Sequence, residues 1–141
     1  MKSHKDLDVW RLAIDLASDV YEVTKTFPKD ERYGMTVQMR RSAISIASNI
    51  AEGAARQGDK EFVQFLHIAL GSVSELDTQL EIAMRVNLTS VESLKGLQDM
   101  AIGINQMLRG LAQSVRSKDH SGTNALIFRH SRYSRHSRGY Q

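Results

Sequence analysis

Cysteine is absent from this sequence of 141 residues, and proline occurs only once. The lack of cysteine excludes a disulfide framework, a thiolate zinc site and a thiol nucleophile. One proline and nine glycines exclude a collagen-like or Pro/Gly-rich low-complexity chain. No apolar run reaches the roughly 18 residues of a membrane span, and residues 1–8 lack the apolar core of a signal peptide. We therefore expect a cytoplasmic protein with no membrane association.

The composition is otherwise that of an ordinary globular protein, but its charge is unevenly distributed. Hydrophobic residues make up 41% of the chain and charged residues 25%, and the length fits one domain. Residues 1–115 carry 13 Lys and Arg against 15 Asp and Glu, a net charge of −2. Residues 116–141 carry six Lys and Arg against one Asp, a net charge of +5. This asymmetry predicts a nearly neutral body with a basic C-terminal arm.

Four segments place apolar residues at steps of three and four, the spacing of helices with a buried face. We expect these helices over residues 8–26, 30–55, 59–86 and 89–115. In the second, two neighbouring apolar seams predict a wide apolar face: Met39, Ala43, Ile46 and Ile50 in one, Val37, Ile44, Ala47 and Ala51 in the other. The expected N-terminal signals are the caps Asp8 and Asp59 and the capping box formed by Thr89 and Glu92. Pro28 and Gly53 mark the ends of the first two helices.

These helices predict an all-α protein. Strand signals are absent before residue 123, and four amphipathic helices with short connections favour an antiparallel up-down four-helix bundle. The expected division is a bundle over residues 1–116 and a flexible, disordered basic tail over 117–141. Some apolar residues lie off the main seams and fit either a wide core or a subunit interface: Trp10, Leu12, Phe65, Ile68 and Leu70.

Polar and small residues within the helices suggest packing rather than catalysis. Gly71 and Ser72 interrupt a strong helix, which suggests close approach of a second helix at Ser45 or Ser48. His67 lacks a Glu-x-x-His motif because residue 64 is Gln, so a di-iron site is not expected. Three further polar residues are Asn49, Glu52 and Glu75. The two carboxylates could act in acid–base catalysis. A hydrogen-bonded structural network fits the three residues better, since no nucleophile and no group of metal ligands accompanies them. We expect no enzyme activity, metal or cofactor.

Several separate motifs resemble one known family. They are Val9-Trp10, Glu31-Arg32-Tyr33-Gly34, Gln38-Met39-Arg40-Arg41-Ser42-Ala43, Asn49-Ile50-Ala51-Glu52-Gly53, Phe65-Leu66 and Glu75-Leu76. Over roughly residues 5–115, the chain resembles the bacterial four-helix-bundle proteins named for the intervening sequences of 23S ribosomal RNA genes. It is also similar to the accessory protein of diversity-generating retroelements. The resemblance implies a homopentameric ring of bundles, and in the retroelement branch it implies binding of nucleic acid or a reverse transcriptase.

Basic residues in the helical part are the first candidates for phosphate binding. They are Arg40, Arg41, Arg56 and Lys60. A guanidinium group presents a fork of donors that suits phosphate oxygens. The alternative for the arginines is an ion pair with Glu52 or Glu75, between helices or between subunits.

The tail supplies the second set of candidates. Arginine recurs there at every third position, as Arg129, Arg132, Arg135 and Arg138, with Tyr133 and Tyr140 interleaved. Basic charge with aromatic rings is typical of flexible segments that bind single-stranded nucleic acid; the alternative is a solubilising extension. The sequence therefore predicts a non-enzymatic oligomer that binds RNA or DNA, or a nucleic-acid enzyme. The alternative function is a protein–protein scaffold without nucleic-acid contact.

Overall fold

The computed structural model describes residues 3–121 and confirms an all-α four-helix bundle. The helices are α1 (Asp8–Thr24), α2 (Met35–Ala54), α3 (Asp59–Arg85) and α4 (Val91–Ser121), with short 3₁₀ helices at His4–Asp6 and Lys29–Glu31. No strand occurs within this described range. The tail arginines at positions 129–138 lie outside the described residues, and α4 continues five residues past the predicted end of the bundle at 116.

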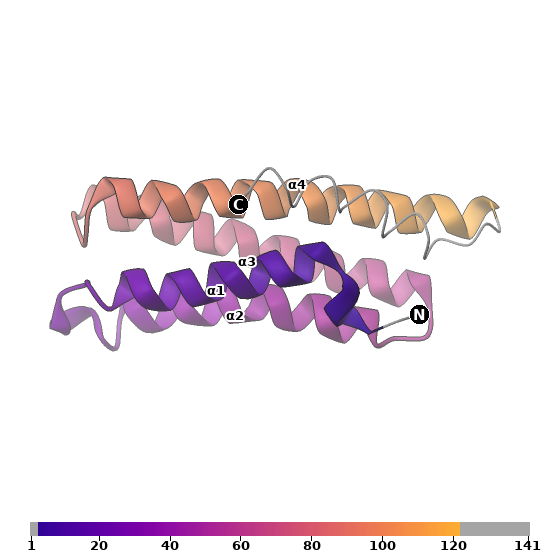
Figure 1. Ribbon diagram of the computed structural model, residues 1–141, viewed down its shortest axis with the longest axis horizontal. Coiled ribbons are helices and arrows are strands. Elements are labelled where there is room, and N and C mark those ends of the chain that lie inside the picture. The colour runs from indigo at the N-terminus through magenta and orange to yellow at the C-terminus, as the bar shows by residue number, and fades with distance from the viewer. Residues whose placement is uncertain (1–2, 122–141) are drawn as a thin grey trace.

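Consecutive helices run antiparallel, and α1 and α4 also contact each other, so the bundle closes on itself (Figure 1). The N-terminal region, the α2–α3 connection and the carboxyl end of α4 lie at one end of the bundle. The α1–α2 connection and the α3–α4 turn lie at the opposite end. Basic groups near residue 56 are therefore at the same end of the bundle as the last described turn of α4.

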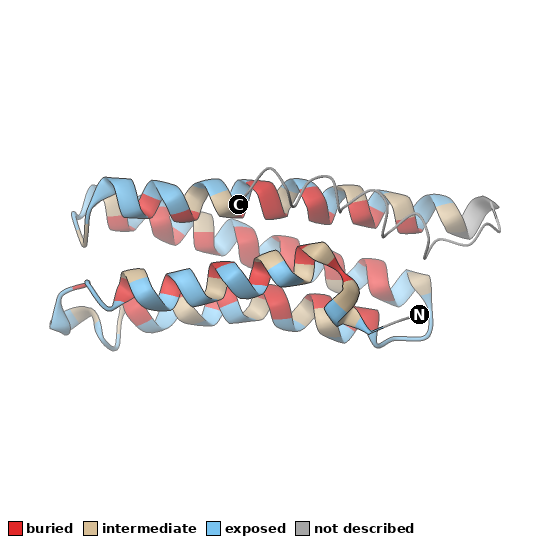
Figure 2. Ribbon diagram, in the orientation of Figure 1, coloured by how far each residue is buried: buried red, intermediate tan, exposed pale blue. Residues whose placement is uncertain are grey.

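The core is built from the seams that periodicity predicts. Leu16 of α1, Ile46 of α2, Leu76 of α3 and Leu108 of α4 are all fully buried. Figure 2 shows the buried positions as regular bands on the inward face of each helix. Burying one such side chain is worth about 1.5–3 kcal/mol, so these seams dominate stability. None of the described helices is long and apolar enough to cross a membrane.

The predicted second seam of α2 is only partly correct. Ala47 is buried, but Val37 and Ile44 are exposed. Both lie on the outer side of α2, because the Met39 seam and the residues next to it already form the buried face of this helix. Among the five off-seam residues, Leu70 belongs to the core, Trp10 and Leu12 pack partly buried against it, Phe65 is half-buried and Ile68 is exposed.

The helix starts differ in detail from the predicted ones. Asp8 and Asp59 are the first helical residues, and the caps are Leu7 and Gly58. The second helix begins at Met35 instead of residue 30, because 29–31 form a 3₁₀ turn. From that turn, the Glu31 carboxylate accepts a hydrogen bond from the Met35 backbone N–H at 3.0 Å. A side chain outside the helix thus satisfies one of its free N–H groups.

The fourth helix is capped by Ser90, not by the predicted box of Thr89 and Glu92. The Ser90 hydroxyl accepts a hydrogen bond from the Ser93 N–H at 3.2 Å. Thr89 instead bonds the Thr26 hydroxyl at 2.7 Å and ties the α3–α4 turn to the end of α1. Asn87 has a φ of 57°, the left-handed conformation that asparagine tolerates at helix ends.

Two glycines have roles different from those predicted. The Ser45 and Ser72 hydroxyls do meet, at 2.8 Å, where α2 contacts α3. Gly71, however, faces open space: a Cβ built there meets nothing within 4 Å. The close approach occurs at Gly53, where a Cβ would lie 2.6 Å from Cβ of Phe65. Gly53 therefore permits contact between α2 and α3.

Candidate nucleic-acid interface

The four candidate cations of the bundle lie at two separate places. Arg40 and Arg41 lie in the second turn of α2, towards the α1–α2 connection. Arg56 follows the end of α2, and Lys60 lies in the first turn of α3. Sixteen residues separate Arg40 from Arg56, about 24 Å at 1.5 Å per residue. The structure therefore does not gather the four into one phosphate site.

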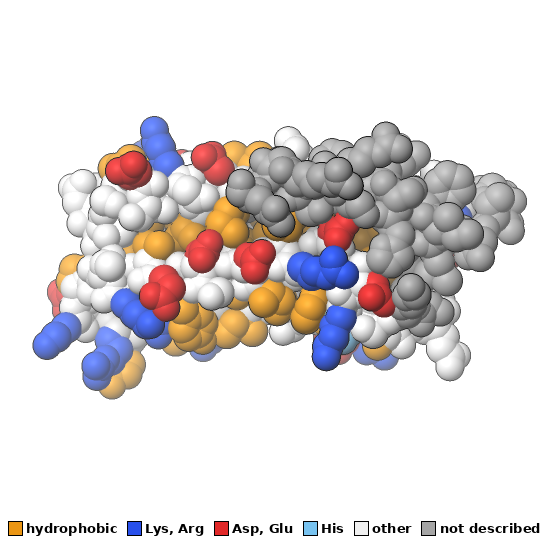
Figure 3. Space-filling view, in the orientation of Figure 1, with side chains coloured by type: hydrophobic (Ala, Val, Ile, Leu, Met, Phe, Trp, Pro, Cys, Tyr) orange, Lys and Arg blue, Asp and Glu red, His pale blue; other side chains and the backbone are white. Residues whose placement is uncertain are grey.

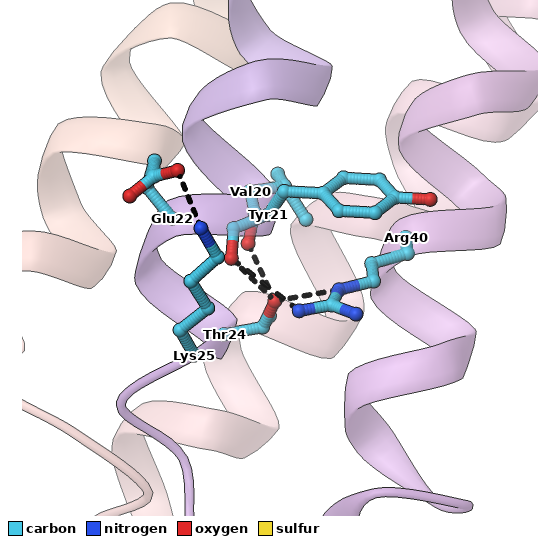
Figure 4. Close-up of polar contacts among 6 residues, drawn as sticks. All are labelled: Val20, Tyr21, Glu22, Thr24, Lys25 and Arg40. Carbon is cyan, nitrogen blue, oxygen red and sulfur yellow. Dashed lines mark hydrogen bonds and ion pairs between the residues drawn. The ribbon is translucent and has the colours of Figure 1, made fainter.

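Arg40 is engaged in contacts between α2 and α1 (Figure 4). Its Nε donates to the Thr24 hydroxyl at 2.9 Å, and Nη2 donates to the Tyr21 carbonyl at 3.4 Å. The guanidinium carbon lies 4.4 Å from the centroid of the Tyr21 ring, a cation–π contact. Thr24 is 3% exposed and donates its own proton to the Val20 carbonyl at 2.7 Å. This geometry favours a structural role for Arg40, with Thr24 as its partner.

Replacing Arg40 with alanine is expected to lower the free energy of unfolding by about 1–2 kcal/mol. The change removes a charge-assisted hydrogen bond and a cation–π contact. Chemical denaturation at fixed protein concentration measures the loss. Lys95→Ala in α4 is the matched control, because Lys95 is exposed and makes no ion pair with other described residues. Equal stability of the two variants would contradict the structural role.

Arg41, by contrast, points to the outer side of α2. It is exposed, and no ion pair or hydrogen bond joins its side chain to another described residue. Glu75 also lacks an ion pair within residues 3–118. Arg41 is thus the one of the two neighbouring arginines whose guanidinium is available to a phosphate or to another protein.

The second pair of cations sits beside carboxylates. Arg56 pairs with Glu52 at 3.5 Å and lies over the Phe65 ring at 4.9 Å. Lys60 is exposed in the first turn of α3, between Asp59 and Glu61. Nearby carboxylates weaken the attraction of these cations for a polyanion. This end of the bundle alone is therefore a weak phosphate site.

The outer side of α1 is acidic. Asp15, Asp19 and Glu22 are exposed on successive turns, and Figure 3 shows acidic side chains spaced along the middle of this face. Partial burial raises the pKa of Asp19 above its usual 3.8, and the negative charges of Asp15 and Glu22 add to the rise. A polyanion approaching this face meets repulsion.

The other polar residues singled out from the sequence contact residues close to them, and they do not come together in a catalytic site. The Asn49 amide donates to the Ser45 carbonyl at 2.8 Å, and Glu75 accepts a hydrogen bond from the Gln79 amide at 3.4 Å. His67 is exposed, and its Nε2 contacts Nη2 of Arg116 in α4. In the described part of the chain, no three His, Cys, Asp or Glu residues are grouped to hold a metal ion.

A shallow groove of about 330 Å³ lies between α3 and α4. Buried Val73 and Ala101 contribute to its lining, together with Ile102 and Asn105. Its one ionisable side chain, Asp77, accepts a hydrogen bond from Gln98 at 3.0 Å. Sequence periodicity does not predict this groove, because it arises from how two helices are juxtaposed. It offers no cation to a phosphate.

Comparison with known proteins agrees with the fold. The chain is similar to a crystallised protein of unknown function from the S23 ribosomal protein family of Bacteroides thetaiotaomicron. The identity is 25%, the TM-score is 0.69, and the match covers 74% of this chain and 97% of that one. No curated protein matches. The family model described as 23S rRNA-intervening sequence protein matches residues 5–110, which include α1, α2, α3 and most of α4. The chain therefore belongs to the 23S rRNA-intervening sequence protein family.

Proposed function

We propose that this protein is a non-enzymatic, self-associating helical bundle that binds RNA or DNA through its basic C-terminal residues. The observation that carries the proposal is the separation of charge: −2 over residues 1–115 and +5 over residues 116–141. Electrostatic contact with phosphates supplies most of the affinity of non-specific nucleic-acid binding. The basic C-terminal segment is the part of this chain with a large excess of cations.

The geometry of the bundle supports this assignment. Arg40 and Arg56 are engaged with other residues of the bundle, and α1 presents carboxylates. The carboxyl end of α4 lies at the same end of the molecule as Arg56 and Lys60 (Figure 1). These two cations are therefore the bundle residues that we propose as secondary contacts for a nucleic acid bound at that end.

Self-association would strengthen weak contacts of this kind. The family resemblance implies five copies, and each copy would add four arginines from positions 129–138. Linked weak sites raise the overall affinity because the second binding event occurs at a high effective concentration. The sequence motifs resemble those of the retroelement accessory protein, and on that resemblance we propose a reverse transcriptase as the protein partner.

The test is a salt titration of binding to labelled single-stranded RNA and duplex DNA. Under the proposal, the binding constant of the full chain falls steeply as salt rises, because bound counterions are released on association. The mass of the oligomer is measured in the same buffers. Absence of binding to either nucleic acid at low salt would overturn the proposal. Salt-insensitive capture of a protein partner would then favour the scaffold function.

A further inference from the structure

Two outer surfaces of the described bundle carry apolar side chains that are about 40–50% exposed. The first is where α1 and α2 meet. Ile14 and Tyr21 are exposed on α1, and Val37 and Ile44 are exposed on α2. Within each pair the spacing is seven residues, so each pair forms a line along its helix. We call these four residues the α1/α2 strip.

The contacts of Arg40 show that the two lines of the strip are neighbours. The Arg40 guanidinium lies over the Tyr21 ring of α1. Val37 and Ile44 lie three residues before and four residues after Arg40, so they share its side of α2. Figure 3 shows hydrophobic side chains gathered below the acidic row, where α1 and α2 meet. Arg41 lies between Val37 and Ile44 in the sequence and is free of ion pairs in the described chain.

The second surface is the outer side of α3. Ile68 and Ile82 are exposed, and Glu75 lies midway between them, seven residues from each. Gly71 lies one turn from Glu75 and has open space above its Cα. A glycine inside a helix costs about 1 kcal/mol relative to alanine, and no described residue occupies the space over Gly71. We call these four residues the α3 ridge.

A buried polar atom beside the α3 ridge lacks a donor. Gln79 is 9% exposed, and its Nε2 donates to Glu75. Its Oε1 has no hydrogen-bond partner among the described residues. An unpaired buried acceptor is costly, so a donor is expected to reach it. No cation among the described residues pairs with the neighbouring Glu75 carboxylate. One guanidinium group can serve both acceptors.

We propose that the α1/α2 strip of one copy packs on the α3 ridge of a second copy, with Arg41 paired to Glu75 and Gln79 across the interface. The apolar lines of one copy then cover those of the other, and the space over Gly71 receives an aliphatic side chain of the strip. Charge complementarity sets the register, because the Arg41 guanidinium on one surface and the Glu75 carboxylate on the other have opposite charges and no ion pair among the described residues. The two surfaces differ, so the contact is head-to-tail.

This inference rests on the self-association in the proposed function and identifies its surfaces. The first test compares two isoleucines of similar exposure in the full-length protein. Ile44 of the strip is 45% exposed, and Ile102 on the outer side of α4 is 50% exposed. Ile44→Glu is expected to shift the mass measured by sedimentation velocity to that of a monomer, and Ile102→Glu is expected to leave the oligomer intact. Circular dichroism confirms that both variants fold.

The second test separates a contact between copies from an ion pair within one copy. Arg41→Glu and Glu75→Arg are each expected to raise the concentration of half-dissociation at least about 30-fold, because a paired charge is lost. Mixing the two variants is expected to restore association between unlike copies, since each contact between an Arg41→Glu copy and a Glu75→Arg copy pairs opposite charges. A closed ring of five keeps one like-charge contact, so the restored affinity is expected to remain below that of the unmodified chain. An Arg41–Glu75 pair inside one copy would not be restored by mixing, and that result would overturn the proposal.

Other outcomes overturn the interface without touching nucleic-acid binding. If Ile44→Glu stays oligomeric while Ile102→Glu dissociates, the copies meet at the α3/α4 surface instead. If the unmodified chain is monomeric at all concentrations, both the interface and the self-association are wrong. Binding of the C-terminal arginines to RNA or DNA is measured separately by the salt titration and does not depend on these results.

Discussion

Replacing Gly53 with alanine is expected to lower the free energy of unfolding by about 2 kcal/mol. The new Cβ would lie 2.6 Å from Cβ of Phe65, 3.2 Å from a ring carbon of Phe62 and 3.3 Å from the Phe62 carbonyl oxygen. These atoms are part of the α3 backbone or close to it, so α2 and α3 must move apart. Overpacking of this kind costs about 3 kcal/mol, and the higher helix propensity of alanine returns about 1.

The measurement is thermal unfolding followed by circular dichroism, with an expected fall in Tm of about 5–8 °C. Gly96→Ala in α4 is the matched control, because a Cβ built at Gly96 meets nothing within 4 Å. In that variant only the propensity gain remains, and Tm is expected to rise. A Gly53→Ala variant as stable as Gly96→Ala would mean that α2 and α3 do not approach closely at this point.

The two glycines show where sequence reasoning about this fold succeeds and where it ends. Steps of three and four predict the buried seams, because the core uses one face of each helix. The same reasoning correctly places Ser45 opposite Ser72. It cannot tell that Gly53 accommodates Phe65 while Gly71 faces outwards, since this depends on the rotation of α3 against α2. Spacing within one helix contains no information about that rotation.

Helix ends were predicted less well than helix faces. At the start of α4, both Thr89 and Ser90 have the hydroxyl that a cap requires. Thr89 does not cap the helix, because its hydroxyl is hydrogen-bonded to that of Thr26, 63 residues earlier in the chain. At α2, the Glu31 side chain caps from a preceding 3₁₀ turn, an arrangement that local sequence patterns do not distinguish from an earlier helix start.

Two neighbouring arginines of the candidate site show the same limit of prediction from the sequence. Arg40 and Arg41 are chemically identical neighbours, and the sequence left both a phosphate role and a structural role open. Their positions differ by 100° around α2, which directs Arg40 towards Thr24 and leaves Arg41 outside. The sequence predicts surplus apolar residues, but most of those that lie off the main seams, such as Leu70, belong to the core or pack against it.

Neutralising the C-terminal arginines is expected to have the largest effect on nucleic-acid binding. The variant replaces Arg129, Arg132, Arg135 and Arg138 with glutamine in the full-length chain. Each phosphate contact contributes about −0.9 to the slope of log K against log salt for duplex DNA and about −0.7 for single strands. Loss of four contacts should make the slope less negative by about 3.6 and about 2.8, respectively. At 0.1 M salt, this corresponds to a loss of roughly 1,000-fold in affinity.

A matched control must remove the same charge from elsewhere. Four exposed cations of the bundle serve this purpose: Lys29, Arg32, Arg85 and Lys95. Their replacement by glutamine lowers the net charge by the same four units, so a purely long-range effect of net charge would reduce binding equally in both variants. Direct contact by the C-terminal arginines predicts a large change in slope in the first variant and a small one in the control. Equal changes in the two variants would mean that net charge acts at long range, and would contradict direct contact by the C-terminal arginines.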